Sequence, residues 1–253
     1  MATYLDEIVA AHRAMRPPVV SGDEIAAAPP VRDFSGALRA ANSLAVIAEI
    51  KRRSPSAGDL RVSLDAVELA TSYERGGAAA LSVLTDAAYF GGSPDDLRAA
   101  RAAVALPVLR KDFTVCPEDV GAARAMGADA VLLIVAALGD DELMNLHAVA
   151  VAHGMDALVE VHDEDELGRA LAAGATLVGV NQRDLRTFSV DHERALRMAG
   201  AIPDGVTKVA ESGVRGADDA RRLADVGYDA VLVGQTLVTA GDPALTLEAL
   251  RCS

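Results

Sequence analysis

One unit recurs along this chain of 253 residues: the end of a helix, a glycine and then a short apolar run. The glycines of this unit are Gly76-Gly77, Gly127, Gly154, Gly174 and Gly227. Glycine readily takes the left-handed conformation that ends a helix. A short run without polar alternation is typical of a parallel strand that is buried on both faces. The repeat therefore predicts an α/β fold in which helices alternate with parallel strands.

Eight such strands fit the sequence. Their expected spans are 44–50, 79–84, 107–111, 130–135, 156–161, 176–180, 206–210 and 229–233. The segments between them have helical spacing and open on acidic residues, serine or proline, as a helix N-terminus favours. The expected openings are Asp65, Ser93-Pro94, Pro117, Asp140, Asp163, Asp191, Asp218 and Asp242-Pro243. Units of about 26 residues predict a (β/α)₈ TIM barrel, a fold of roughly 250 residues.

The first 43 residues precede the barrel and are predicted to form a helical extension, with helices over 4–15 and 33–42. The barrel would occupy 44–253, so that 1–253 is a single domain. The rival architecture is an open doubly wound sheet, which normally carries a glycine-rich turn after its first strand. Residues 51–56 read Lys-Arg-Arg-Ser-Pro-Ser, and the barrel is favoured.

Composition excludes several classes of protein. The chain has 37 acidic and 24 basic residues, a net charge of −13, and 3% aromatic residues, which argues against a nucleic-acid partner. No apolar run reaches about 18 residues, and the first residues lack the pattern of a secretory signal, so we expect a cytoplasmic protein without a membrane partner. Two cysteines, Cys116 and Cys252, predict neither a disulfide framework nor a metal cluster.

Polar residues gather at the C-terminal ends of the expected strands, where barrel enzymes work. These residues are Glu49, Lys51, Lys111, Glu160, Asn181, Arg183 and Glu211. Charged side chains are rarely buried without partners. A ring of them costs folding free energy, which indicates a functional rather than a purely structural role. The alternation of a strand places Glu49 and Lys51 on one face. Glu49 could nevertheless serve only to hold Lys51, and Glu160 could be an ion-pair partner of a lysine.

Lysine is scarce: 21 of the 24 basic residues are arginine, and the lysines are Lys51, Lys111 and Lys208. Lysine can lose its proton when its surroundings lower its pKa, and arginine cannot. Two of the three lysines fall at expected catalytic strand ends, which favours a chemical role for Lys51 and Lys111. Lys208 should point away from Glu211, and we interpret it as a salt-bridged strand terminus.

Two glycine-containing loops predict a phosphate site. Ser212-Gly213 and Gly234-Gln235 follow the last two strands, where backbone N–H groups and a short helix N-terminus favour an anion. Ser54 in the first loop could add a hydroxyl. Phe90 and Phe113 follow the second and third strands and could wall an apolar pocket beside Lys111, although as core residues they would be unremarkable.

The remaining candidates are given structural roles. Arg52, Arg53 and Arg110 are expected to be charges at the rim of the site. His162 is expected on the face opposite Glu160, with a surface role. His12, His147, His153 and His192 are placed in helices at the surface, and Cys116 is interpreted as an inert thiol that opens a helix.

These residues form motifs that resemble those of one family, indole-3-glycerol phosphate synthase. The motifs are Glu49-Ile-Lys-Arg-Arg-Ser-Pro-Ser56, Leu109-Arg-Lys-Asp-Phe113, Leu158-Val-Glu-Val161, Gly179-Val-Asn-Gln-Arg-Asp-Leu185 and Ala210-Glu-Ser-Gly213. The resemblance covers essentially the whole chain, including the N-terminal extension. The first and third of these motifs are highly specific.

The resemblance implies a lyase of tryptophan biosynthesis that needs no cofactor or metal and no obligate protein partner. It would close the indole ring of a small phosphorylated molecule, 1-(2-carboxyphenylamino)-1-deoxyribulose 5-phosphate, with loss of carbon dioxide and water. Lys111 would be the general acid at the substrate carbonyl, Glu160 an acid/base in the dehydration, and Lys51 a binder of the anionic substrate that could share the acid role.

The resemblance also implies roles for the other candidates. Glu49, Asn181 and Glu211 would position the substrate and tune the lysines, and Arg183 would support the carboxylate region. Phe90 and Phe113 would line the pocket for the aromatic ring, and Ser54, Gly213, Gly234 and residue 235 would hold the phosphate. Gln235 departs from the small hydroxyl residue or glutamate usual there, so only its backbone N–H is expected to serve.

Two expectations concern the chemistry and motion of the site. A lysine of ordinary pKa is a weak acid at neutral pH, so a second cation such as Lys51, with partial burial, is expected to lower the pKa of Lys111 toward about 7–8. The loop over residues 51–60 is expected to close over the substrate.

Three alternatives remain open from the sequence. Another phosphate-binding barrel, such as the isomerase of the preceding step, would need a cysteine and an aspartate at strand ends. A Schiff-base lyase would use Lys111 as its nucleophile. A non-catalytic paralogue would bind phosphorylated metabolites without turnover.

Overall fold

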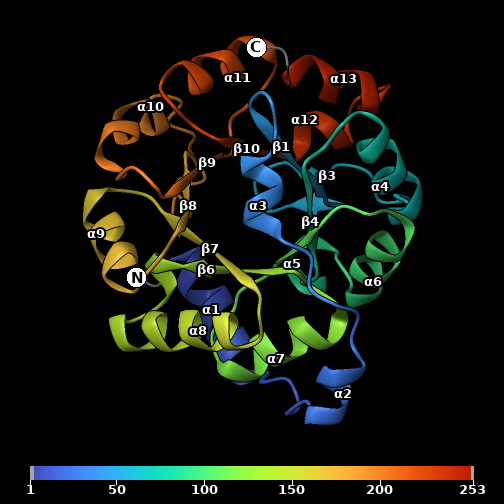
Figure 1. Cartoon of the computed structure of the whole chain (residues 1–253), viewed down its shortest axis with the longest axis vertical. Coiled ribbons are helices and arrows are strands. Elements are labelled where there is room, and N and C mark those ends of the chain that lie inside the picture. Colours follow the sequence, from blue (N-terminus) through green and yellow to red (C-terminus); the bar gives the residue numbers. More distant parts are fainter. Residues whose placement is uncertain (1–2, 252–253) are drawn as a thin grey trace.

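Eight parallel strands form a closed barrel in the computed structural model, which describes residues 3–251. Their bounds are β1 Ala45–Ile50, β4 Ala80–Leu84, β5 Val108–Lys111, β6 Ala130–Ile134, β7 Asp156–Val161, β8 Leu177–Asn181, β9 Thr207–Glu211 and β10 Ala230–Val233. Neighbours follow in chain order and β10 pairs with β1, so the ring closes and leaves no sheet edge. Figure 1 shows this ring surrounded by helices. The predicted (β/α)₈ TIM barrel is confirmed, and every strand lies within one residue of its expected span.

The outer helices cover the barrel. They are α4 Ala66–Arg75, α6 Pro94–Ala103, α7 Pro117–Met126, α8 Asp140–Ala152, α9 Glu164–Ala172, α10 Arg194–Met198, α11 Ala217–Asp225 and α13 Pro243–Leu250. Asp65, Asp163 and Asp242 each cap the N-terminus of the following helix through a side-chain oxygen, as their positions predicted. None of the helices within residues 3–251 is long and apolar enough to cross a membrane.

The expected helix start at Asp191 is wrong. The helix α10 begins at Arg194, and residues 182–191 fold back on the end of β8 instead. The N–H of Asp191 donates to the carbonyl of Gln182 at 2.8 Å, and Arg183 pairs with Val190 in an isolated bridge. The Asp191 carboxylate accepts the N–H of Glu193, so it stabilises a turn before the helix.

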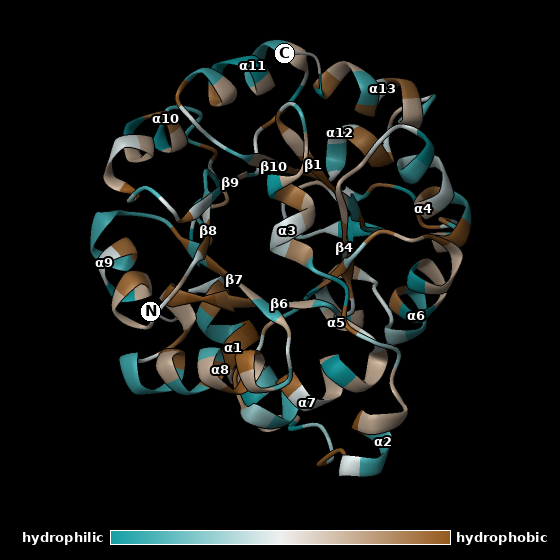
Figure 2. Cartoon of the chain, viewed as in Figure 1, coloured by the Kyte–Doolittle hydropathy of each residue, from teal (hydrophilic) through white to brown (hydrophobic). Residues whose placement is uncertain are grey.

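Apolar side chains fill two layers. One layer lies inside the barrel and includes Ile47, Leu109, Leu158 and Leu177, while a larger one fills the space between the strands and the outer helices. Figure 2 shows hydrophobic strands enclosed by helices in which hydrophilic and hydrophobic residues alternate. Because both faces of the strands are buried, the strand sequences lack a polar alternation until their C-terminal ends.

The N-terminal extension forms α1 Tyr4–Ala14, α2 Gly22–Ala27 and α3 Phe34–Arg39. Helix α3 covers the N-terminal end of the barrel, where the hydroxyl and N–H of Ser35 donate to Asp156 at the start of β7. In Figure 1 this helix crosses the centre of the ring. Helix α2 was not predicted from the sequence. Cys252, one of the two cysteines considered above, lies outside the described residues.

Helix α1 packs at the opposite end of the barrel, beside the loops that follow β4 and β8. The ring of Tyr4 meets those of Tyr89 and Phe188 edge to face, with ring centroids 5.8 Å and 5.0 Å apart. The extension thus runs from the C-terminal ends of the strands to the N-terminal end of the barrel.

A buried carboxylate, Asp129, ties the extension to the barrel. It accepts a hydrogen bond from Arg101 at 2.9 Å and the backbone N–H groups of Arg32 and Val108 at 2.8 Å. Asp129 is fully buried, and Arg101 is nearly so. Its removal would leave a buried guanidinium without its charge partner.

We therefore expect Asp129→Ala to lower the free energy of unfolding by about 3 kcal/mol, measured by urea denaturation. The matched control is Asp204→Ala, at an exposed turn position, which should change stability by less than about 0.5 kcal/mol. Equal midpoints for the two variants would contradict the role given to Asp129.

Candidate active site

A cavity of about 470 Å³ opens at the C-terminal ends of the strands. Every candidate residue from the sequence lines it: Glu49, Lys51, Ser54, Phe90, Lys111, Phe113, Glu160, Asn181, Arg183, Glu211, Ser212, Gly213, Gly234 and Gln235. Because parallel strands end at one face of a barrel, positions scattered over nearly 190 residues of sequence meet in one mouth.

The side chain of Lys111 lies between two buried carboxylates. Its Nζ is 3.0 Å from Glu160 Oε2 and 3.1 Å from Glu211 Oε2. The three groups come from β5, β7 and β9, and the two glutamates are at most 2% exposed. Such a charge-assisted cluster fixes the ammonium group in one position above the barrel core.

The charges of this cluster set its protonation. Burial alone would lower the pKa of Lys111, but the carboxylates of Glu160, Glu211 and Glu49 hold it above its ordinary value. The expected lowering of this pKa is therefore wrong for the arrangement seen here. Lys51, the expected second cation, pairs with Glu49, so its charge is compensated.

The two glutamates beside Lys111 differ. Burial and the neighbouring charge of Glu160 raise the pKa of Glu211 to about 7, although Lys111 opposes the shift. The pKa of Glu160 lies below its usual range despite burial, because Lys111 and His162 stabilise its charged form and the Asn181 side chain donates to it. The pair therefore shares one proton near neutral pH, held on Glu211.

Two glycines make room for these carboxylates. A Cβ on Gly179 would lie 2.0 Å from Glu211 Oε1, and one on Gly234 would lie 2.2 Å from Glu49 Oε1. A side chain at either position would displace the carboxylate that it meets, so these glycines serve close approach rather than an unusual backbone conformation.

The loops after β9 and β10 form the end of the cavity expected to hold phosphate. Ser212 and Gly213 have φ values of 65° and 76°, and the amide of Gln182 donates to the Ser212 carbonyl at 2.7 Å. A left-handed serine is strained and is held in place by its surroundings. Gly234 precedes the short helix α12 Gln235–Val238. The first N–H groups of a helix are suited to binding an anion.

The opposite end of the cavity is apolar. The rings of Phe90 and Phe113 lie 6.3 Å apart at an angle of 36°, with Leu132 and Ile134 beside them in the lining. Phe90 belongs to α5 Ala87–Phe90, whose N–H groups at Tyr89 and Phe90 donate to Asp86. The end is suited to an aromatic ring.

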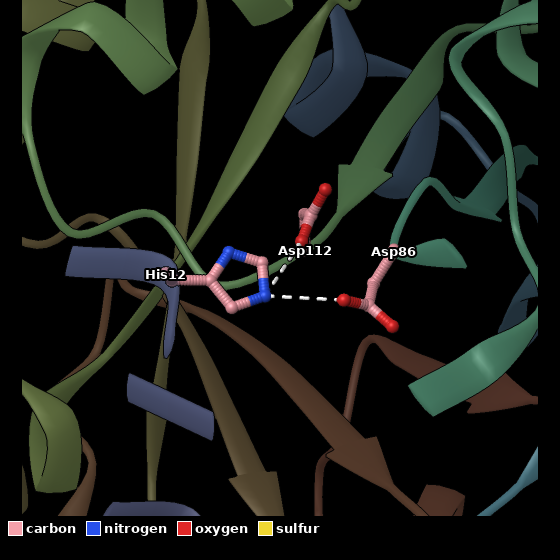
Figure 3. A group of neighbouring side chains, drawn as sticks. All are labelled: His12, Asp86 and Asp112. Atoms are coloured by element: carbon pink, nitrogen blue, oxygen red, sulfur yellow. Dashed lines mark hydrogen bonds and ion pairs between the residues drawn. The ribbon is translucent and has the colours of Figure 1, made fainter. Parts of the chain in front are cut away.

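A histidine of the N-terminal extension supports this apolar end. Figure 3 shows His12 of α1 pointing at Asp86 and Asp112, with Nε2 3.1 Å and 3.9 Å from their nearest oxygens. Three such groups could also hold a metal ion. However, Asp112 already accepts hydrogen bonds from Arg110, Thr85 and its neighbour's N–H. Burial alone would lower the pKa of His12, but the aspartates raise it, so a protonated histidine accounts for the arrangement.

The loop after β1 folds into a small hairpin over one side of the cavity. Its strands are β2 Arg53–Ser54 and β3 Gly58–Asp59. Arg52 pairs with Asp96 at the start of α6, and Arg53 donates to the carbonyl of Ala88. These contacts hold Ser54 at the cavity wall.

Several expectations about single residues are wrong. Arg110 is not a rim charge but is buried, where it pairs with Asp112 at 2.8 Å. His192 lies in the turn before α10, not in a helix, and lines the cavity. His12 and His162 are largely buried rather than at the surface.

His162 was missed because its face was assigned wrongly. It follows Glu160 by two residues, and side chains two apart point to the same side of a strand. Its Nε2 lies 3.7 Å from Glu160 Oε1. The spacing alone could have found it. The wall residues Leu185 and Phe188 were also missed, because they belong to the turn that replaced the expected helix start.

The interpretation of Cys116 agrees with the geometry, and that of Lys208 agrees only in the direction of its side chain. Cys116 caps α7, and burial raises the pKa of its thiol to about 12, which suits an inert thiol. Lys208 points away from the cavity and donates from Nζ to the carbonyl of Ala199 at 3.2 Å. Its partner is therefore a carbonyl rather than the expected carboxylate.

Comparison with known proteins now assigns the family. The sequence profile described as indole-3-glycerol phosphate synthase matches residues 3–250. Indole-3-glycerol phosphate synthase 2 of Streptomyces coelicolor is 56% identical over 94% of this chain and 92% of its own length. Indole-3-glycerol phosphate synthase of Leptothrix cholodnii is 53% identical over 99% and 96%, respectively.

The chain belongs to the indole-3-glycerol phosphate synthase family. Membership makes it a carboxy-lyase of tryptophan biosynthesis and confirms the resemblance stated from the motifs. More distant solved structures share the fold alone. The crystal structure of 3-hexulose-6-phosphate synthase covers 82% of this chain and 98% of its own, with a TM-score of 0.66 at 18% identity. Thiamine phosphate pyrophosphorylase from Pyrococcus furiosus covers 87% and 96%, with a TM-score of 0.62 at 20% identity.

Proposed function

We propose that the chain closes the indole ring of 1-(2-carboxyphenylamino)-1-deoxyribulose 5-phosphate in the cavity described above, with Lys111 as general acid. The observation that carries this is the position of the Lys111 ammonium, fixed by two buried carboxylates between an apolar end and an end rich in backbone donors. The substrate has the same order of parts: an aromatic acid, a carbonyl and a phosphate.

The first step forms a carbon–carbon bond. The ring carbon that bears the carboxylate attacks the ketone carbon, and Lys111 gives a proton to the ketone oxygen, which becomes a hydroxyl. Carbon dioxide then leaves with its bonding electrons returned to the ring. The raised pKa of Lys111 keeps its proton in place until an oxyanion develops beside it. Phe90 and Phe113 hold the ring, and Arg183 and Lys51 attract the carboxylate.

The second step removes water. The hydroxyl leaves as water with a proton taken from the solvent, and a carbon-bound proton of the neighbouring CH₂ group goes to a base, which completes the indole double bond. Glu160 is the base in this proposal, since it stays ionised and lies beside Lys111. Glu211 and Asn181 position both groups, and Glu49 positions Lys51. In both proposed steps, side chains of this chain transfer protons or stabilise charge.

The phosphate would lie on the loops after β9 and β10. The backbone N–H groups of Gly213, Gly234 and Gln235 are the proposed donors there, with Ser212 and the hydroxyl of Ser54 beside them. We also propose that the protein acts in the cytoplasm, since the reaction is biosynthetic and its substrate is a small phosphorylated molecule.

The Schiff-base alternative is less suited to this site. An amine must be neutral to attack a carbonyl, and the carboxylates around Lys111 favour its charged form. The test of the proposed function is a fluorescence assay for indole product with the named substrate. Formation of an indole ring that keeps the phosphorylated side chain (the indole product) and of carbon dioxide in equal amounts supports it. A borohydride-trapped adduct on Lys111 without indole would overturn it.

We expect Gly234→Ala to raise KM about tenfold, a loss of about 1.4 kcal/mol in binding. The added Cβ would meet Glu49 Oε1 at 2.2 Å and Lys51 Nζ at 3.1 Å, so it would displace this ion pair beside the proposed phosphate position. Steady-state kinetics would measure the change. Gly241→Ala is the control, because a Cβ there meets nothing within 4 Å. An unchanged KM in Gly234→Ala would contradict the proposed position of the phosphate.

A further inference from the structure

The ring of His162 is held in one orientation at the end of β7. Glu166 holds the ring through one oxygen, Oε2. This oxygen accepts a hydrogen bond from the backbone N–H of His162 at 2.8 Å, and it lies 3.0 Å from the ring atom Nδ1. Glu166 itself is fixed because its N–H donates to Asp163 at the start of α9. The histidine is 12% exposed at its side chain, and it does not line the cavity.

The other ring nitrogen faces the proposed base. Nε2 of His162 lies 3.7 Å from Oε1 of Glu160. Within residues 3–251 neither atom has a hydrogen-bond partner, although both are buried. Lys111 occupies the other oxygen of the same carboxylate, Oε2. Two buried polar atoms without partners that face each other would be costly unless a proton lies between them.

The surrounding charges favour that proton. Burial alone would lower the pKa of His162, but Glu166 on α9 and Glu160 on β7 raise it, with Arg194 on α10 opposing them. A doubly protonated ring donates from Nδ1 to Glu166 and directs a second N–H toward Glu160. The carboxylate of Glu160 also faces Lys111, Asn181 and Glu211, so His162 is its second cation.

We propose that His162 is a positioning residue for Glu160: as an imidazolium it fixes the Oε1 side of that carboxylate and keeps it ionised while Lys111 holds the Oε2 side. The separation of 3.7 Å is longer than a hydrogen bond, and such contacts tighten when a substrate closes the site. The inference rests on the proposed role of Glu160 in the dehydration.

The test is the pH dependence of kcat in His162→Gln, which keeps a donor of similar reach but cannot carry charge. Without the cation, the proton that the Glu160–Glu211 pair holds near neutral pH shifts from Glu211 toward Glu160 and is bound more tightly, so the acidic limb of the profile should move up by about one pH unit. At pH 6.5 we expect about a tenfold lower kcat than in the wild type. At pH 9, where the Glu160–Glu211 pair has lost its shared proton in both enzymes, the ratio should shrink to about twofold.

Two further variants make the result decisive. Glu166→Gln removes the charge that stabilises the imidazolium, and it should shift the acidic limb in the same direction by a smaller amount. It also replaces the main variant if His162→Gln fails to fold, which thermal unfolding would reveal. His147→Gln, on α8 and away from the cavity, should reproduce the wild-type profile.

The outcomes separate this inference from the proposed function. A wild-type enzyme that forms no indole would overturn the proposed function. A wild-type enzyme that turns over, with His162→Gln and Glu166→Gln profiles parallel to it, would overturn the positioning role alone. A uniform loss of kcat at every pH would also overturn it, because packing and not charge would then be the cause.

Discussion

Replacement of Lys111 by alanine is expected to lower kcat for indole formation by at least about a thousandfold. The ammonium group supplies both the proton for the ketone oxygen and the positive charge that stabilises it. Its loss also leaves Glu160 and Glu211 close together without their shared cation, so that the pair binds its shared proton more tightly. Single-turnover kinetics with the purified variant would measure the effect.

The chain offers a matched control in its third lysine. Lys208→Ala removes an ammonium from the same barrel, but one that bonds to the Ala199 carbonyl outside the cavity, and its kcat should stay within about twofold of the wild type. Lys111→Arg separates charge from acidity, because arginine keeps the charge and cannot release the proton. Near-normal turnover in Lys111→Ala would remove the basis of the proposed mechanism.

Most of this fold could be predicted from the sequence, because the ends of helices and the buried strands depend on interactions between residues that are close in sequence. The glycines at 127, 174 and 227 take positive φ at helix ends, and each precedes an apolar strand within one residue of the expected span. Both features depend on a few adjacent residues. The failure at Asp191 has a different origin, since its carboxylate can cap a helix or a turn equally well. The choice was made by the pairing of Arg183 with Val190, which is a tertiary contact.

The members of the site could be predicted, but not their electrostatics. Strand ends meet on one face by topology, so Glu49, Lys111 and Glu211 could be placed together without coordinates. Which of these side chains form ion pairs depends on the distances between them across the barrel. Lys111 lies between two carboxylates from β7 and β9. These carboxylates raise the pKa of Lys111, whereas the sequence predicts a lowered pKa. In this chain of net charge −13, Lys51, Lys111 and Arg183 line the cavity, but the two lysines are paired there with Glu49, Glu160 and Glu211.

Replacement of Glu160 by glutamine is expected to lower the rate of indole formation about a thousandfold, through loss of the base in the dehydration. The amide has the same shape and can still accept a hydrogen bond from Lys111, so the site should keep its geometry. Ring closure and decarboxylation depend on Lys111 and should survive. With enzyme in excess over substrate, the variant should therefore release carbon dioxide much faster than it forms indole.

The ratio of the two products makes this prediction independent of general damage to the site. Glu164→Gln, an exposed position in the first turn of α9, should leave both rates unchanged and controls for the substitution itself. If carbon dioxide and indole fall together in Glu160→Gln, the carboxylate acts at or before ring closure. Lys111 and Glu160 would then work on the same step, and their contact at 3.0 Å would serve to aim the acid rather than to divide the two proton transfers.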